Sequence, residues 1–257
     1  TRSRGLGDVY KRQVMIEAKE DFNNTWPFKA NFFSGNGFKQ HYVDEGKENK
    51  KVILCLHGEP TWGYIYRHFI RELSKDFRVV VPDLMGFGKS ETPKNKEYSL
   101  KTHVENLENL VNYLKLENIY FVGQDWGGPI LGAYTLRNLK NTKGMFLINT
   151  ILGYSRTEKP KELTPWFKWI KKNEENGTLD GILGELNTTV LSIMKLLNFT
   201  NSSIIDDNWI KAYASPFPNR DSCLGAINFP LDVLHERMVP FITVSYTHLT
   251  LPTTVRV

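Results

Sequence analysis

Cysteine is scarce in this chain, whose 257 residues include only Cys55 and Cys223. Two cysteines are too few for a disulfide framework and are typical of a reducing compartment, so we expect a cytoplasmic protein. No run approaches the roughly 18 consecutive apolar residues of a membrane span. Hydrophobic residues make up 40% of the chain and aromatic residues 12%, which indicates a filled globular core in one large domain, or in one domain with an insertion.

The sequence also lacks the patterns of cofactor, metal and nucleic-acid sites. It has no phosphate-binding glycine loop and no cluster of His, Cys and carboxylate residues at ligand spacing, so we expect neither a cofactor nor a metal. The net charge is +5, but residues 1–13 and Arg256 together supply four of these charges. The rest of the chain is nearly neutral and has no basic stripe, which argues against a nucleic-acid surface.

The two ends of the chain differ in residue pattern from the sequence between them. Residues 1–13 (TRSRGLGDVYKRQ) and 244–257 (VSYTHLTLPTTVRV) show no amphipathic period and resemble translated adapter sequence at the edges of metagenome-derived reading frames. A signal peptide is the alternative for the first, but the apolar stretch of about 7–15 residues is missing. We expect both ends to be non-native tails around a native segment that is cut off on its C-terminal side.

Short apolar runs alternate with helical patterns between residues 38 and 148. The predicted strands are residues 38–45, which alternate as an antiparallel edge strand does, and the continuous apolar runs 52–56, 77–81, 119–122 and 145–148. The predicted helices are residues 64–73, 100–114 with Ser99 as N-cap, and 128–134. This order predicts an α/β fold with a mostly parallel sheet, helices on both faces, and functional sites at the carboxyl ends of the strands.

The pattern changes after residue 152. Residues 153–230 contain helical stretches at 166–171 and 188–197 but no comparable strand, which indicates a helical cap inserted above a core formed by residues 14–152. Residues 231–243 would begin the return to the core.

The pentapeptide at residues 123–127 (GQDWG) follows a predicted strand and opens a predicted helix. This is the setting of a nucleophile elbow, which reads Gly-x-Ser-x-Gly in most α/β-hydrolases. Asp125 takes the nucleophile position here. A carboxylate that attacks carbon forms an ester that water must then cleave, which suits displacement at saturated carbon. The motif therefore points to carbon–halogen or epoxide substrates.

Together with residues 57–62 (HGEPTW), 82–90 (PDLMGFGKS) and 213–218 (YASPFP), this motif resembles the haloalkane dehalogenases, in particular the subgroup with Glu after His-Gly. The resemblance implies an α/β-hydrolase fold, small halogenated substrates, halide as product, no cofactor, and a monomer when complete. It implies that Asp125 attacks the carbon, that the backbone N–H groups of Glu59 and Trp126 form the oxyanion hole, and that the Trp126 indole binds halide. Trp166 is the candidate for a second halide donor, with Trp169 as the alternative.

Plainer interpretations exist for several of these residues. An Asp before a helix is usually only an N-cap, but the flanking glycines, Trp126 and the upstream motif favour a nucleophile at Asp125. Asp83 is expected to shape its turn, and His57 to brace its loop. The remaining histidines at positions 41, 68, 103 and 235 are interpreted as surface or packing residues, and Cys55 as a buried small hydrophobe.

Ester hydrolysis also needs a histidine base oriented by a carboxylate. Asn149 stands at one position where the family carries that acid and cannot serve, so the resemblance puts both groups beyond Thr243, with the sheet's final strands. His248 lies in the tail and receives no role. We expect this polypeptide at best to form a covalent alkyl-enzyme and stall.

Two other interpretations remain open. Epoxide hydrolases share the Asp nucleophile but need two cap tyrosines, and only Tyr154 and Tyr213 are available, in contexts that do not match. A ligand-binding member of the fold without catalytic activity is the other.

Overall fold

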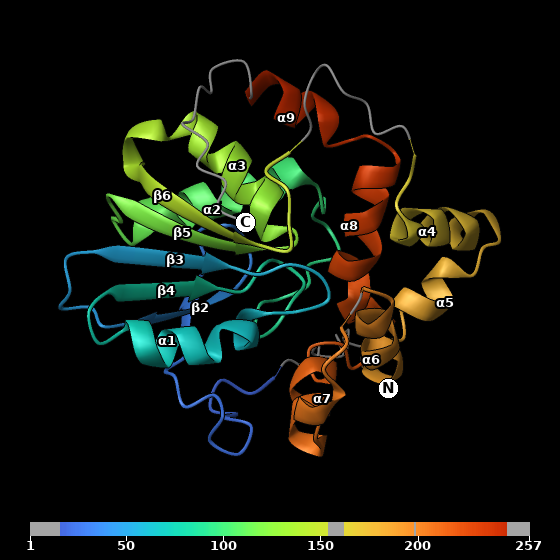
Figure 1. Cartoon of the computed structure of the whole chain (residues 1–257), viewed down its shortest axis with the longest axis horizontal. Helices are drawn as coiled ribbons and strands as arrows, with labels where there is room; N and C mark the ends of the chain where they lie inside the picture. Colours follow the sequence, from blue (N-terminus) through green and yellow to red (C-terminus); the bar gives the residue numbers. More distant parts are fainter. Residues whose placement is uncertain (1–15, 154–161, 198, 246–257) are drawn as a thin grey trace, which may run out of the picture.

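The computed structural model describes residues 16–153, 162–197 and 199–245. It contains a six-stranded sheet in the order β1-β2-β4-β3-β5-β6, drawn across the middle of Figure 1. The sheet is mixed: β3, β4, β5 and β6 run parallel, whereas β1 and β2 pair antiparallel. The predicted α/β class is confirmed.

The central strands are β3 (Val52–Leu56), β4 (Arg78–Pro82) and β5 (Ile119–Gln124), followed by β6 (Thr142–Ile148) at the edge. All of β3 is buried, as its uninterrupted apolar run predicts for a strand covered on both faces. Because these strands are parallel, their carboxyl ends meet at one edge of the sheet. This arrangement brings together the residues that follow the strands, where the sequence predicts the functional site.

The antiparallel side of the sheet differs from the prediction in one respect. β2 (Gln40–Glu45) is antiparallel but is not the edge, because β1 (Asn31–Phe33) pairs with it. β1 has only three residues, too few to show an alternating pattern in the sequence. As the second strand in, β2 is buried along nearly its whole length.

Helices α1, α2 and α3 pack against the sheet in the pattern that the alternating sequence predicts (Figure 1). The short 3-10 helix η1 (Gly63–Tyr66) continues into α1 (Arg67–Leu73), and α2 covers Leu100–Tyr113. The predicted N-cap is confirmed: the Ser99 side chain accepts a hydrogen bond from the Thr102 N–H. α3 (Gly127–Arg137) begins directly after the elbow and is almost entirely buried in its first nine residues.

Beyond β6, every regular element that the structure describes is helical, and these helices gather beside the sheet in Figure 1. The α-helices are α4 (Pro165–Glu175), α5 (Leu179–Leu183), α6 (Leu186–Leu196), α7 (Asp207–Ala214), α8 (Leu224–Leu234) and α9 (Val239–Ser245), and the 3-10 helices are η3 (Ser202–Ile204) and η4 (Arg220–Cys223). α8 packs against α4 and α5, whereas α9 returns to α3. The division into core and cap stays a prediction.

The predicted tails lie outside the described residues except for the last two residues of α9. Among the helices that are described, none is long and apolar enough to cross a membrane.

Candidate active site

Asp125 occupies a sharp bend between β5 and α3. Its φ is +51°, a left-handed conformation that is uncommon for any residue but glycine. The bend depends on close approach by neighbouring glycines: a Cβ on Gly127 would lie 2.1 Å from the carbonyl oxygen of Leu56, and one on Gly58 would lie 2.2 Å from Asp125 Oδ1. No larger residue fits either position without backbone movement, so these glycines bring the loop after β3 against the elbow.

The Asp125 carboxylate is held by backbone donors. The Glu59 N–H donates to Oδ1 at 2.8 Å, and the Trp126 N–H donates to the same carboxylate. Burial raises the pKa of Asp125, while these two hydrogen bonds oppose the rise. The Thr150 hydroxyl donates to the Asp125 backbone carbonyl and so fastens the end of β6 to the elbow. The carboxylate thus faces the His-Gly loop and is not used to cap α3.

A second carboxyl group lies close to the first. The Glu59 side chain is 5% exposed, and its Oε1 has no hydrogen-bond partner among the described residues. Burial, and then the charge of Asp125, raise the pKa of Glu59 well above its ordinary value. The site therefore holds two buried carboxyl groups with raised pKa values, of which Glu59 has the larger rise. Only the backbone of Glu59 was expected to matter, because a sequence does not show that its side chain is enclosed.

Trp126 follows Asp125 in the turn between β5 and α3. Its ring stacks on Phe229 of α8, with centroids 4.2 Å apart and an interplanar angle of 12°. Trp126 is 7% exposed, and the role of its indole N–H as a halide donor stays a prediction. Phe229 was not anticipated, because an apolar residue in a helical stretch gives no signal of which aromatic ring it contacts.

Trp166 and Trp169 lie together on α4. Their rings stack at 5.3 Å with an interplanar angle of 13°, and both are partly buried. This contact between residues three positions apart fits packing, and no ring contact joins either of them to Trp126 within the described part of the chain. Trp166 as a second halide donor stays a prediction.

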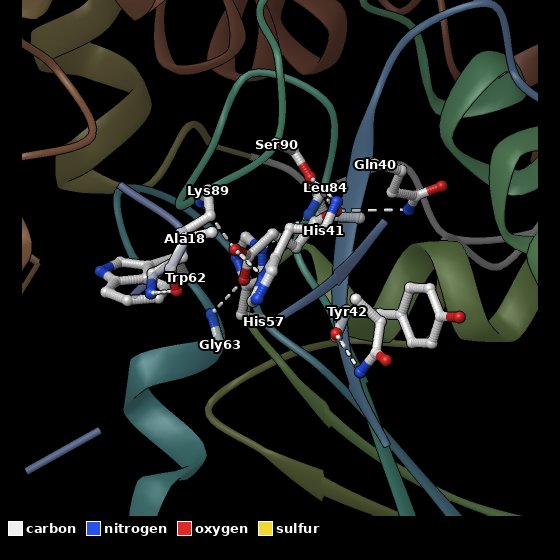
Figure 2. Close-up of polar contacts among 12 residues, drawn as sticks. Ala18, Gln40, His41, Tyr42, His57, Trp62, Gly63, Leu84, Lys89 and Ser90 are labelled. Atoms are coloured by element: carbon white, nitrogen blue, oxygen red, sulfur yellow. Dashed lines mark hydrogen bonds and ion pairs between the residues drawn. The ribbon is translucent and has the colours of Figure 1, made fainter. Parts of the chain in front are cut away.

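Asp83 follows β4 and is fully buried, but it is saturated with donors. Its oxygens accept from the Gly63 N–H, the Lys89 N–H and His41 Nδ1, each at 2.8 Å. Burial alone would raise the pKa of Asp83, but His41 and the hydrogen bonds reverse this and lower it. Figure 2 shows His41, Gly63 and Lys89 converging at this point. The arrangement agrees with the predicted turn-shaping role.

His57 is similarly committed. Its Nε2 accepts from the Leu84 N–H at 2.9 Å, so Nδ1 carries the proton and donates to the Gly58 carbonyl, also at 2.9 Å (Figure 2). Burial lowers the pKa of His57 and keeps the ring neutral. Its geometry agrees with the expected bracing of the loop, since neither nitrogen is free to accept a proton.

The other described histidines lie in different settings. His41 is buried on Asp83, His68 is exposed on α1, and His235 pairs with Glu174 on the surface. His103 is buried beside Phe229, and neither of its ring nitrogens has a partner among the described residues. Burial lowers the pKa of His103 to about 3. The structure does not describe His248, Tyr154 or residues 1–15. Among the residues that it does describe, no cluster of His, Cys and carboxylate groups is suited to a metal.

Comparison with known proteins assigns the fold to a family. The sequence model of the α/β-hydrolase fold matches residues 51–180. Haloalkane dehalogenase 2 of Mycobacterium tuberculosis is 39% identical over 125 residues, covering 49% of this chain and 43% of that protein. A cis-3-alkyl-4-alkyloxetan-2-one decarboxylase of Shewanella oneidensis is 31% identical over 212 residues, covering 80% of this chain and 63% of that protein. The chain thus spans less than two thirds of either relative.

Among solved structures, the tetrameric haloalkane dehalogenase of Paraglaciecola agarilytica superimposes with a TM-score of 0.71 and 27% identity, covering 90% of this chain and 75% of that one. The chain belongs to the α/β-hydrolase superfamily, and part of it is similar to haloalkane dehalogenases.

Proposed function

We propose that this chain is a haloalkane dehalogenase in which Asp125 is the nucleophile. The observation that supports this most directly is the Asp125 carboxylate on its left-handed bend, held by the backbone N–H groups of Glu59 and Trp126. An aspartate locked in helix capping or turned to solvent could not attack carbon. This one is held by only two backbone donors, so lone pairs remain for a substrate.

In the first step, a carboxylate oxygen of Asp125 attacks the halogen-bearing carbon from the side opposite the halogen. A carbon–oxygen bond forms as the carbon–halogen bond breaks, and halide leaves with its electron pair. The Trp126 indole N–H, next to the nucleophile on a ring held by Phe229, donates to the departing halide. We propose Trp166 as a second donor. If a Trp166→Phe variant forms the ester at the wild-type rate, Trp166 is not a halide donor.

In the second step, water attacks the ester carbonyl and the oxyanion is stabilised by the same two backbone N–H groups. This step needs a base. His57 uses both nitrogens and His41 is held by Asp83, whereas His103, beside Phe229, has unpartnered nitrogens but a pKa lowered to about 3, which makes it a weak base. We therefore propose that the ester accumulates on this polypeptide. Small halogenated substrates and a monomeric state are part of the same proposal.

The test is intact-protein and peptide mass spectrometry after incubation with 1-bromobutane. We expect one butyl group on Asp125 and about one bromide released per chain. Asp125→Asn should abolish the adduct, and Asp76→Asn, which changes an exposed aspartate, should not. Peptide mapping separates this ester from alkylation of Cys55 or Cys223. Bromide released over many equivalents would contradict the stalled ester, and no adduct on Asp125 would contradict the nucleophile.

The similarity to the oxetan-2-one decarboxylase, which covers more of this chain than the dehalogenase match does, favours a second candidate. The ring carbon bonded to oxygen in such a lactone is saturated, and its leaving group is a carboxylate. Asp125 could therefore displace it by the same substitution. Loss of carbon dioxide from the freed carboxylate would then form the alkene and expel the Asp125 carboxylate as leaving group. Incubation with a cis-dialkyl oxetan-2-one, followed by analysis for carbon dioxide and alkene, distinguishes this reaction from halide displacement.

Epoxide hydrolysis is less well supported. It requires cap tyrosines to protonate the opening ring, but the Tyr213 hydroxyl is engaged by the Arg67 side chain, and its ring packs on Tyr64 and Trp209. A ligand-binding protein without catalytic activity would show neither adduct nor released halide in the same experiments.

A further inference from the structure

Tyr66, the last residue of η1, carries a buried hydroxyl that no step of the proposed reaction uses. The residue is 2% exposed, so it leaves almost no surface for a substrate. Burial, and then the nearby Cys55 thiol and Asp125 carboxylate, raise the pKa of Tyr66 well above its ordinary value. The hydroxyl is therefore a neutral hydrogen-bonding group close to the nucleophile but away from solvent.

This hydroxyl joins the ends of two neighbouring strands. Tyr66 Oη donates to the Leu56 carbonyl at 2.8 Å and accepts from the Gln124 backbone N–H. Leu56 ends β3 and Gln124 ends β5, and the two parallel strands are paired side by side (Figure 1). The last pair of their register is Leu56 with Gly123, so the hydroxyl acts where the strands separate into the His-Gly loop and the elbow.

The Leu56 carbonyl is also the point at which β3 touches the elbow. A Cβ on Gly127 would lie 2.1 Å from its oxygen, so the start of α3 rests directly against this group. Leu56 is fully buried, and water cannot replace a lost hydrogen bond there without entering the core. A shift of this carbonyl would move Gly127 and, through it, the bend at Asp125.

Tyr66 is itself held in place. At the start of η1 the Gly63 N–H donates to Asp83 Oδ1 at 2.8 Å, and at its end the Tyr66 ring packs on Phe69 of α1 with centroids 5.9 Å apart. Because both ends of this short helix are fixed, the hydroxyl reaches the strand ends from a turn that is already ordered.

We propose that Tyr66 is a positioning residue for the nucleophile: its hydroxyl joins the ends of β3 and β5 and so fixes the direction in which the Asp125 carboxylate points. The inference rests on the proposed function, because this direction matters only if Asp125 attacks carbon. Displacement requires alignment with the leaving group, and a misplacement of about 1 Å can reduce the rate by roughly a hundredfold. The left-handed φ of +51° at Asp125 persists only while the surrounding contacts enforce it.

The test compares two variants that each remove one buried hydroxyl. Tyr66→Phe removes the bridge. Tyr98→Phe is the matched control, because Tyr98 is 6% exposed, donates to the Pro93 carbonyl at 3.0 Å, and packs in a separate cluster with Phe38 and Met85. Urea denaturation should show a similar loss of stability in both variants.

Ester formation with 1-bromobutane, followed by mass spectrometry, should separate the two variants. We expect Tyr66→Phe to lower the rate constant at saturating substrate by about tenfold to a hundredfold, with the half-saturating concentration within about twofold of the wild type. Tyr98→Phe should change neither. A wild-type rate constant in Tyr66→Phe would overturn the proposal, and so would equal slowing in both variants, which would indicate a general loss of stability. A higher half-saturating concentration at an unchanged rate constant would also overturn it, since the effect would then lie in substrate binding.

Failure of the proposed function is recognised separately, because the wild-type chain would then form no ester on Asp125. Amide hydrogen exchange measured by NMR tests the bridge without any reaction. The Gln124 N–H should exchange about tenfold faster in Tyr66→Phe than in Tyr98→Phe, since only the first variant removes its acceptor. Equal exchange in the two variants would overturn the bridging role of Tyr66.

Discussion

Two aspartates follow the strands that flank β3, and they differ in almost every respect except position. Asp83, after β4, accepts three hydrogen bonds, one of them from a buried histidine, and its pKa is lowered. Asp125, after β5, accepts two backbone N–H groups, lies beside the buried Glu59, and has a raised pKa. Both occupy the edge of the sheet where α/β proteins place their sites.

The difference shows that the donors around a carboxylate, more than its place in the fold, decide what it can do. A carboxylate with every strong acceptor direction filled fixes its loop and has no capacity left for a substrate. A carboxylate with few donors, close to a second acid, is less stable as an anion and retains free lone pairs. Asp83 therefore serves structure, while Asp125 is suited to attack.

The largest expected effect comes from removing the reactive member of the pair. Asp125→Asn should reduce ester formation with 1-bromobutane by roughly 10⁴-fold or more, the order of loss seen when a covalent nucleophile is removed. The same variant should raise the free energy of unfolding at neutral pH, because it removes a buried charge that burial disfavours. Mass spectrometry and urea denaturation measure the two effects.

Asp83→Asn should act in the opposite direction on stability. It breaks a fully buried pair with His41 and returns a donor toward the Gly63 or Lys89 N–H, so we expect a loss of about 3 kcal/mol. Urea denaturation at neutral pH checks this. A loss no greater than that of the exposed variant Asp76→Asn would mean that the two aspartates do not differ as described.

Acid should destabilise the protein through His103, whose surroundings resemble those of Asp125 in offering few partners. Its pKa is about 3 when folded and near 6.5 when unfolded, so only the unfolded state takes up a proton between these values. Stability present above pH 6.5 is lost as the pH falls, by about 2 kcal/mol at pH 5. His103→Leu should lack this part of the loss when urea denaturation is compared at pH 7 and pH 5.

The smallest effect concerns Glu59. Because its pKa is raised, the folded state holds a proton that the unfolded state releases, so stability falls as the pH rises above the ordinary value of 4.5. The slope for one such proton is about 1.4 kcal/mol per pH unit. Glu59→Gln should flatten this part of the pH dependence when urea denaturation is compared over a series of pH values above 4.5. If the dependence of stability on pH is unchanged in this variant, the Glu59 carboxyl is exposed to water.

Much of the sheet could be predicted because its strands are local apolar runs: the prediction for residues 52–56 coincides with β3, and Ser99 caps α2 as expected. β1 was missed because three residues carry no period. Within the site, the glycines and Trp126 identified the elbow from their spacing alone. The stacking of Phe229 on Trp126 and the burial of Lys89, whose Nζ bonds to the carbonyls of Ala18 and Glu20, depend on contacts between distant segments.

One consequence concerns the imidazole that joins the loops after β3 and β4. Since His57 bonds to Gly58 on one side and Leu84 on the other, the separation of these loops is set by the width of a single aromatic ring. The direction in which the Glu59 N–H points is thereby tied to the neighbouring strand. A shorter or longer side chain at position 57 would shift the Glu59 N–H and, with it, the Asp125 carboxylate that this N–H holds.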